Sequence, residues 1–339
     1  MIIYVLRRLL TMAVTLLVIS MLIFVIIKLP PGDYLTTRLD ELRSQGDPAS
    51  AAKADMLRAQ YGLDKPIWYQ YATWVGIWPK PSGFSGLLQG DWGQSFEYDV
   101  PVSEVVGAAL GMTLLINLAT VIFIHVVAIP IAIYSATHRN SVGSHVITFL
   151  GYIGLATPSF LLALALLFYL NRWFGISIGG MMDPVYADQP MSMAKLGSVL
   201  SHLIVPVVVI GLAGTAGMIR RMRANLLDEL NKQYTVTAKA KGLPPVRALL
   251  KYPFRIALNP FVADIGNILP HIVSGSVLVS LVLSLPTVGP ILLQALKVQD
   301  QYLAGFILMF VAALTVVGML IADLALAVLD PRIRLGRHG

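Results

Sequence analysis

Long runs of apolar residues dominate the chain, and the polar residues gather between them. Six such runs cover roughly residues 9–29, 107–134, 146–170, 199–219, 262–286 and 303–328. Each run is close to or above the roughly 20 residues that a helix needs to cross a bilayer. The pattern therefore predicts an all-α membrane protein with six transmembrane helices.

The polar intervals predict how the chain is organised. Residues 1–29 are expected to form the N-terminal end and the first transmembrane helix, and residues 30–104 an external segment. Residues 105–328 are expected to form a core of five further helices, and residues 329–339 a tail. The first apolar run is too long for the hydrophobic part of a signal peptide, and no small-residue cleavage site follows it. We therefore expect it to be retained.

The distribution of Lys and Arg predicts the orientation of these helices. The N-terminus, residues 135–145, residues 220–261 and the tail together hold 15 Lys and Arg residues against three acidic residues. The opposite set of flanks holds 10 basic and 13 acidic residues. Because Lys and Arg concentrate in cytoplasmic loops, both termini are expected in the cytoplasm of a cell whose inner membrane the chain spans. The net charge of +7 thus reflects topology and predicts no nucleic-acid partner.

The sequence offers little material for catalysis or metal binding. It has no cysteine, which excludes disulfides and Cys-based metal sites, and its six His are scattered. It contains neither the P-loop pattern G-x-x-x-x-G-K-[ST] nor H-E-x-x-H. Residues 175–179 match G-x-S-x-G around Ser177, but that motif acts only on a strand-to-helix turn of an α/β sheet. We expect no catalytic residue, metal or cofactor in this chain; an intramembrane enzyme using Ser177 remains the alternative.

A few polar residues and prolines interrupt the apolar runs. Four ionisable residues lie well inside them: His125, Asp264, His271 and Asp323. Such residues are costly in lipid and commonly face a bundle interior or a water-filled path. One interpretation is an ion relay, as in a secondary transporter. Asn267 and His271, one helical turn apart, together with Pro158, which breaks the third run, are our candidates for a translocation path.

Residues 220–261, which we call the basic segment, are the most informative polar interval. A helical stretch runs to Lys241, Gly242 is a natural helix stop, and Pro245 is a natural start for a second helix. On that second helix Arg247, Lys251 and Arg255 recur every four residues. This arrangement is equally consistent with a helix pair gripped by a partner protein and with a basic helix lying on anionic lipid.

The basic segment resembles a known signature. Residues 233–243 read QYTVTAKAKGL and are similar to the D-Y-[IV]-R-T-A-R-A-K-G-L motif of dipeptide and oligopeptide ABC importer permeases, a variant of the E-A-A-x-x-x-G coupling loop. Further similar motifs follow the same order along the chain: PGD at residues 31–33, YGLDKP at 61–66, GDWGQS at 90–95, TPSF at 157–160 and LDPRIR at 329–334. The chain has Gln233 where the peptide-permease signature has Asp, and Val236 and Thr237 where the general coupling-loop motif has Glu and its first Ala; it keeps Ala238 and Gly242 of that core pattern.

The resemblance implies a type I ABC importer fold and a division of labour. It implies that this chain pairs with a second homologous permease, that two cytoplasmic ATPase subunits bind ATP and Mg, and that an external solute-binding protein delivers peptides. Oligosaccharides, opines and metal chelates are the alternative cargoes. The residues that the resemblance places at the ATPase contact are Thr237, Ala238, Lys239, Ala240, Lys241, Gly242, Leu243, Pro244 and Arg247.

Overall fold

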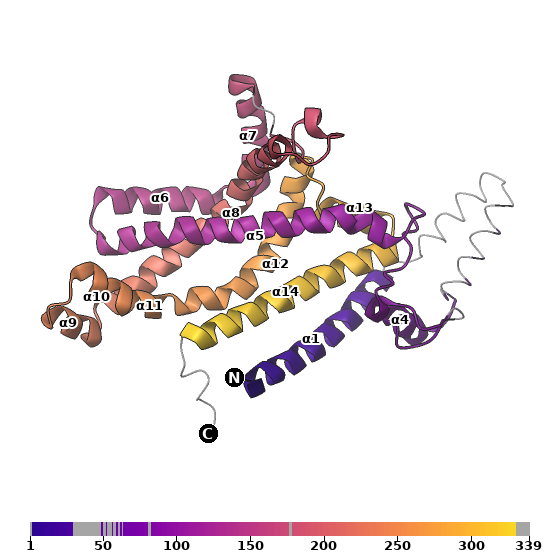
Figure 1. Cartoon of the computed structure of the whole chain (residues 1–339), viewed down its shortest axis with the longest axis horizontal. Helices are drawn as coiled ribbons and strands as arrows, with labels where there is room; N and C mark the ends of the chain where they lie inside the picture. Colours follow the sequence, from indigo (N-terminus) through magenta and orange to yellow (C-terminus); the bar gives the residue numbers. More distant parts are fainter. Residues whose placement is uncertain are drawn as a thin grey trace. The chain divides into compact units, whose positions relative to one another are not determined.

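The protein is helical throughout the part of the chain that the computed structural model describes, which comprises residues 2–29, 64–80, 83–175 and 178–329 and a few isolated positions between 49 and 62. Its longer helices are α1 (Ile2–Lys28), α5 (Val102–Thr137), α6 (Val142–Ala156), α7 (Ser159–Phe174), α8 (Met193–Leu230), α12 (Asn259–Val282) and α14 (Gln301–Leu329) (Figure 1). The shorter ones are α4 (Ile67–Val75), α9 (Gln233–Ala240), α10 (Pro245–Lys251), α11 (Pro253–Ala257) and α13 (Val288–Lys297), with 3-10 turns η1 (Leu87–Gln89) and η2 (Pro184–Tyr186). Within these described ranges, β structure is limited to two isolated bridges. The all-α prediction is confirmed.

Among the described residues, four helices are individually long and apolar enough to cross a membrane: α1 from Tyr4, α5, α8 and α14. The pair α6 and α7 makes a fifth candidate if the two halves form one span. The fifth predicted run, residues 262–286, falls largely on α12, but many side chains in the middle of this helix lie outside the described residues. The count of six spans stays a prediction.

The third apolar run is broken. Helices α6 and α7 meet at an angle of 99° across Thr157 and Pro158. Proline has no N–H to continue the helical ladder, and it disfavours the helical conformation of the residue before it. Thr157 is accordingly extended, with φ −84° and ψ 120°. The run is broken at Pro158, as predicted, and forms a bent pair that extends from Val142 to Phe174.

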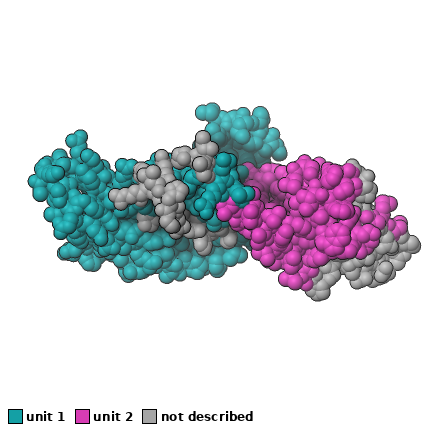
Figure 2. Space-filling view, turned by 90° about the horizontal axis from the view of Figure 1, so that it is seen from below, with its two compact units in different colours: residues 1–10, 112–287, 314–339 teal, residues 11–111, 288–313 magenta. Residues whose placement is uncertain are grey.

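The chain divides into two compact units, which Figure 2 shows in separate colours. Unit 1 comprises Met1–Leu10, Met112–Thr287 and Leu314–Gly339, and unit 2 comprises Thr11–Gly111 and Val288–Ala313. Helices α1, α5 and α14 have residues in both units. The predicted boundaries at residues 29, 104 and 328 remain untested, and much of the predicted external segment and nearly all of the tail lie outside the described residues.

The core of unit 1 surrounds α8. Its fully buried side chains include Ile124 of α5, Met218 and Met222 of α8, and Phe261 of α12. Glycines bring the backbones close: a Cβ added at Gly214 would lie 2.8 Å from Ile124 Cδ1. Small residues permit such close packing between membrane helices, where dispersion forces rather than hydrophobic burial hold helices together.

One ion pair joins the first and last helices within unit 1. Arg8 Nη2 of α1 donates to Asp323 Oδ1 of α14 at 2.5 Å. The pair supplies a partner for Asp323, one of the four ionisable residues inside the apolar runs. A charge without a partner is expensive in such surroundings, so the contact stabilises the pairing of the two helices.

We expect Asp323→Asn to lower the thermal stability of the detergent-solubilised protein, because Arg8 then loses its counter-charge. Both side chains are partly accessible, so the expected cost is about 1–2 kcal/mol rather than the full penalty of a buried pair. The charge swap Arg8→Asp with Asp323→Arg should restore much of the loss. A single variant with unchanged melting temperature would contradict this role.

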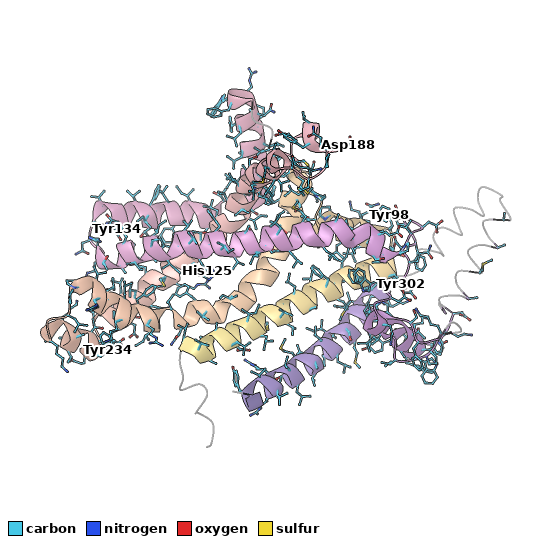
Figure 3. All side chains as sticks on the ribbon, in the orientation of Figure 1. Tyr98, His125, Tyr134, Asp188, Tyr234 and Tyr302 are labelled. Carbon is cyan, nitrogen blue, oxygen red and sulfur yellow. The ribbon has the colours of Figure 1, made fainter. Side chains whose placement is uncertain are left out.

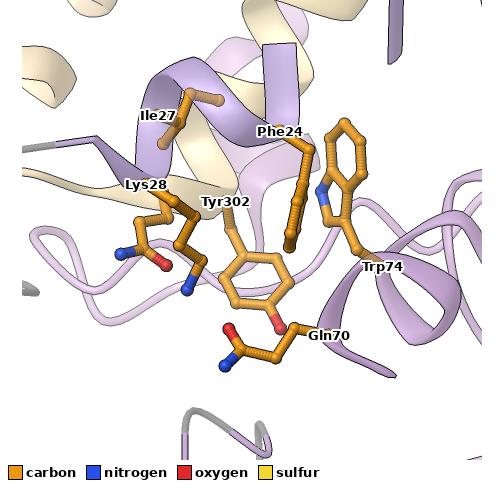
Figure 4. A pocket seen from close by; sticks show the side chains of 7 residues that line it. Phe24, Ile27, Lys28, Gln70, Trp74 and Tyr302 are labelled. Atoms are coloured by element: carbon orange, nitrogen blue, oxygen red, sulfur yellow. The ribbon is translucent and has the colours of Figure 1, made fainter. Parts of the chain in front are cut away.

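Helices α1 and α4 pack against each other in unit 2. Phe24 and Trp74 are buried against each other with ring centroids 5.5 Å apart, and Ser20 Oγ hydrogen-bonds Tyr71 Oη at 2.8 Å. The side chains of Figure 4 enclose a cavity of about 20 Å³ beside this contact. That volume suits a single water molecule and is far too small for a peptide.

A buried carboxylate, that of Asp300, joins a loop of unit 2 to the start of α14. Asp300, fully buried, accepts hydrogen bonds from Ser95 Oγ at 2.6 Å and from the backbone N–H groups of Glu97 and Leu303, both at 3.1 Å. We call Ser95, Glu97, Asp300 and Leu303 the Asp300 clasp. Burial raises the pKa of Asp300, and the hydrogen bonds that it accepts oppose that rise. The clasp fixes the loop at 93–101 to the start of α14.

A second carboxylate orders the turn just before the clasp. Asp91 Oδ1 accepts from Gly93 N at 3.0 Å, and Asp91 Oδ2 accepts from Ser85 Oγ and lies 3.3 Å from Lys80 Nζ. Burial by itself would raise the pKa of Asp91, but the hydrogen bonds from Ser85 and Gly93 and the charge of Lys80 outweigh it and lower that pKa.

This lowered pKa predicts a loss of stability in acid. A carboxyl group whose pKa is lower in the folded state stabilises the fold above its unfolded pKa, near 4, and loses that contribution as the pH falls through the folded pKa. Below about pH 4, we expect the melting temperature of Asp91→Asn to fall less steeply with decreasing pH than that of the wild type. The check is thermal unfolding between pH 3 and 7; identical slopes for the two proteins would count against it.

Candidate functional site

Three short helices, α9, α10 and α11, form the part of the basic segment between the long helices α8 and α12. They lie together at one end of α8 (Figure 1), and α11 packs directly on α8. Helix α8 has 38 residues and measures roughly 57 Å at 1.5 Å per residue, well beyond the roughly 30 Å of a hydrocarbon core. Its last turns, with Arg220, Arg221 and Arg223, are therefore long enough to project from the membrane and carry the short helices.

The turn between α9 and α10 has a defined backbone. Gly242 has φ +78°, Gly242 N donates to Lys239 O at 2.9 Å, and Leu243 N donates to Ala238 O at 3.3 Å. These two hydrogen bonds and the left-handed glycine form a Schellman motif that ends α9. Pro244 and Pro245 then start α10, since the fixed φ of proline suits the first helical position. The predicted stop at Gly242 and start at Pro245 are confirmed.

Most of the nine predicted contact residues lie on the surface. Thr237, Lys239, Ala240, Lys241, Gly242, Pro244 and Arg247 are exposed, and Leu243 is half-buried. Ala238 is the exception, with 5% of its surface exposed. The turn and the adjoining helix ends thus present a basic surface, while Ala238 belongs to the packing beneath it.

The packing beneath the turn ties it to the long helices. Thr235, fully buried, donates from Oγ1 to Glu229 O at 3.0 Å and so fixes the start of α9 to the end of α8. Ala136 of α5, Leu226 of α8 and Ala257 of α11 form a small core, against which the following partly buried residues pack: Ile133, Leu227, Leu230, Leu249 and Phe254. This core therefore joins α10 and α11 to the ends of α5 and α8.

The sequence did not identify Thr235 or this small core as part of the site. Thr235 falls at a [IV] position of the resembled signature, where only a β-branched shape is expected. A threonine in place of an aliphatic residue close to a helix end is the available signal, because its hydroxyl can satisfy a free backbone carbonyl.

The segment continues almost without interruption into α12. Tyr252, with φ −116° and ψ −79°, joins α10 to α11, and Leu258 alone separates α11 from α12. Phe254 and Leu258 both pack against the core of unit 1. The short helices are thus directly continuous with α12, the helix on which the sequence places the candidate path residues Asn267 and His271.

The candidate path residues are only partly described. Pro158 is the N-cap of α7 at the 99° bend. Asn267 and His271 lie on α12, but their side chains are outside the described residues. The structure does not bring these three together in any described contact, and their role stays a prediction.

The other chemical candidates gain no support as a reaction centre. His125 Nδ1 contacts Val121 O at 2.8 Å on its own helix α5, and Asp323 is paired with Arg8. The side chain of Asp264 and the whole of Ser177 lie outside the described residues. In the part of the chain that was searched, no three His, Cys, Asp or Glu residues gather closely enough to hold a metal ion.

Comparison with known proteins covers almost the entire chain. The family described as "Binding-protein-dependent transport system inner membrane component" matches residues 128–335, and its N-terminal counterpart for membrane components matches residues 1–119. The oligopeptide transport system permease protein AppB of Bacillus subtilis is 34% identical over 331 residues, 97% of this chain and 98% of that protein.

Two further relatives show the same coverage. The dipeptide transport system permease protein DppB of Escherichia coli is 28% identical over 347 residues, and the oligopeptide transport system permease protein OppB of Mycobacterium tuberculosis is 30% identical over 337 residues. Each alignment spans 98% of both chains. The similarity therefore extends over both compact units.

Proposed function

The chain belongs to the family of inner membrane components of binding-protein-dependent transport systems, and we propose that it is the membrane-spanning permease subunit of an ATP-driven peptide importer. The observation that carries this proposal is its near full-length similarity to peptide permeases of several bacteria. It is a transporter permease rather than an enzyme. Oligosaccharides, opines and metal chelates are the alternative cargoes within the same machinery.

The partners follow from the kind of system. The importer comprises this chain, a second homologous permease, two ATPase subunits that bind ATP and Mg, and an external solute-binding protein. The chain itself needs no cofactor. The excess of Lys and Arg on the basic segment supports a cytoplasmic position for that segment and for both termini, since the rule for membrane proteins counts these residues.

The turn at Gly242 is the element that an ATPase subunit contacts in this proposal. A small, exposed and rigidly capped helix end is suited to docking in a groove of a partner. Closure of the ATPase pair around ATP moves α9 and α10, and the small core of Ala136, Leu226 and Ala257 carries the movement to α5 and α8. Direct continuity through α11 carries it to α12.

Such coupling needs a helix bundle with two discrete arrangements rather than a flexible bundle. Packed cores switch between discrete arrangements, so a small displacement of a docked helix is amplified into a rocking movement of the long helices. The bend between α6 and α7 supports a position of this helix pair beside a translocation path. A broken helix is tolerated in a membrane only where protein or a water-filled cavity covers its free backbone groups.

The test is purification of the tagged chain from mildly solubilised membranes, with mass spectrometry of the proteins that accompany it. We expect a second permease and ATPase subunits. The recovered complex, reconstituted with its binding protein, should take up labelled peptide only with ATP. Uptake by the chain alone, driven by a proton gradient, would instead establish a secondary transporter.

A further inference from the structure

An open groove lies beside the coupling turn within unit 1 and has a volume of about 830 Å³. The ends of α5 and α8 form one wall, and α9 and α10 form the other. The volume falls in the range of small-molecule binding sites. Of the nine residues proposed for the ATPase contact, Lys239 alone lines the groove among the described residues, so that contact does not account for it.

The lining combines an apolar wall with a basic rim. The apolar wall consists chiefly of Ile133, Leu227, Leu230, Val246, Leu249 and Leu250. Arg139, Lys239 and His138 also line the groove, and none of the described residues that line it is acidic. The His138 ring is held by stacking on Tyr134, with ring centroids 4.8 Å apart; Tyr134 lies near that end of α5 (Figure 3).

The groove lies at the end of a span. Helix α5 passes the test for a membrane-crossing helix and ends at Thr137, one residue before His138. The end of α5 therefore places one edge of the groove near the level of the lipid headgroups. Val246 and Leu250 are about 67% and 49% exposed, so part of the wall needs a cover.

The charge selects the kind of occupant. The chain's own tail, residues 330–339, carries Arg332, Arg334 and Arg337, and its N-terminus carries Arg7 and Arg8, so both would be repelled from a basic groove. An anionic amphiphile fits both the basic rim and the apolar wall. Basic pockets between helices on the cytoplasmic side of membrane proteins are suited to anionic headgroups.

We propose that this groove binds one anionic phospholipid, with its phosphate at Arg139 and Lys239 and an acyl chain along the wall of α5, α8 and α10. The site goes beyond the proposed transport function: it concerns lipid binding, which can be measured without ATP or cargo. The bound lipid would brace the coupling helices against the end of α5.

The experiment compares two charge reversals in the full chain, Arg139→Glu and the control Lys251→Glu. Both residues are exposed cations of the basic end of unit 1, but Lys251 does not line the groove. Each protein, within its complex, is incorporated into nanodiscs that contain phosphatidylglycerol and phosphatidylcholine. The complex is then released, and the lipids that it retains are counted by native mass spectrometry.

We expect the wild type and Lys251→Glu to retain one phosphatidylglycerol, and Arg139→Glu to bind it roughly 30-fold more weakly, since each charge near an anionic surface contributes roughly fivefold. A second variant, Ile133→Trp, fills the apolar wall without a charge change and should cause a comparable loss. Equal retention by Arg139→Glu and Lys251→Glu would overturn the proposal. A cross-link between residue 139 and an ATPase subunit, found together with loss of the bound lipid, would also overturn the proposal. The groove would then be a protein interface.

Discussion

We expect Gly242→Pro to abolish ATP-coupled peptide uptake and to leave the protein inserted in the membrane. Proline fixes φ near −65°, whereas Gly242 has φ +78°, and proline also removes the N–H that donates to Lys239 O. Both halves of the Schellman motif are lost, so α10 leaves the end of α9 in a different direction. Uptake of labelled peptide into proteoliposomes that contain the whole complex measures the effect.

The matched controls separate backbone conformation from side-chain volume. Nothing lies within 4 Å of a Cβ added at Gly242, so a side chain as such meets no obstacle. Asparagine tolerates the left-handed conformation and should retain most uptake, while alanine, which pays about 1 kcal/mol there, should fall between asparagine and proline. Normal uptake by Gly242→Pro would show that the turn is not the coupling element.

ATP hydrolysis distinguishes two causes of a failure. If Gly242→Pro keeps the ATPase subunits bound but hydrolysis no longer responds to the loaded binding protein, the turn transmits the movement. If the ATPase subunits are lost on purification, the turn is needed for docking itself. Either result supports the proposed contact, and membrane fractionation establishes that the variant is inserted.

The features that the sequence predicts well are those that local rules determine. A run of about 20 apolar residues has few alternatives to a membrane helix, and Gly242 followed by Pro244-Pro245 has few alternatives to a helix stop and restart. The break at Pro158 was predicted for the same reason. Its 99° angle was not, because a proline permits a bend whose size depends on the packing around it.

The features that escaped prediction join residues far apart in the chain. Arg8 and Asp323 are 315 residues apart, and Ser95 and Asp300 are 205 residues apart. No periodicity or motif spacing links such positions in a single sequence. The groove beside the coupling turn escaped for a related reason: the apolar residues of its wall read as ordinary helix faces until the fold brings four helices together around them.

Asp300→Ala should destabilise unit 2 more than any surface change in it. The variant removes, at a fully buried position, the acceptor of the hydrogen bonds from the Ser95 hydroxyl and from the N–H groups of Glu97 and Leu303. Loss of the cap at the start of α14 costs about 1 kcal/mol, and each buried donor left unsatisfied costs roughly 1–3 kcal/mol more. We expect a loss of about 3 kcal/mol or more, seen as a lower melting temperature and faster proteolysis within residues 93–101.

The control for this prediction is Asp64→Ala, which removes an exposed carboxylate of the same unit that pairs with its neighbour Lys65 and should cost less than about 1 kcal/mol. Asp300→Asn keeps a good helix cap but has only one acceptor oxygen, so it should lie between the two. Ser95→Ala combined with Asp300→Ala should cost less than the sum of the single changes, because the two side chains share one hydrogen bond. Two results would contradict this role: additive effects in the double variant, or equal melting temperatures for Asp300→Ala and Asp64→Ala. Either would mean that the stacking of Trp92 on Phe306, rather than the carboxylate, holds the loop at 93–101 to α14.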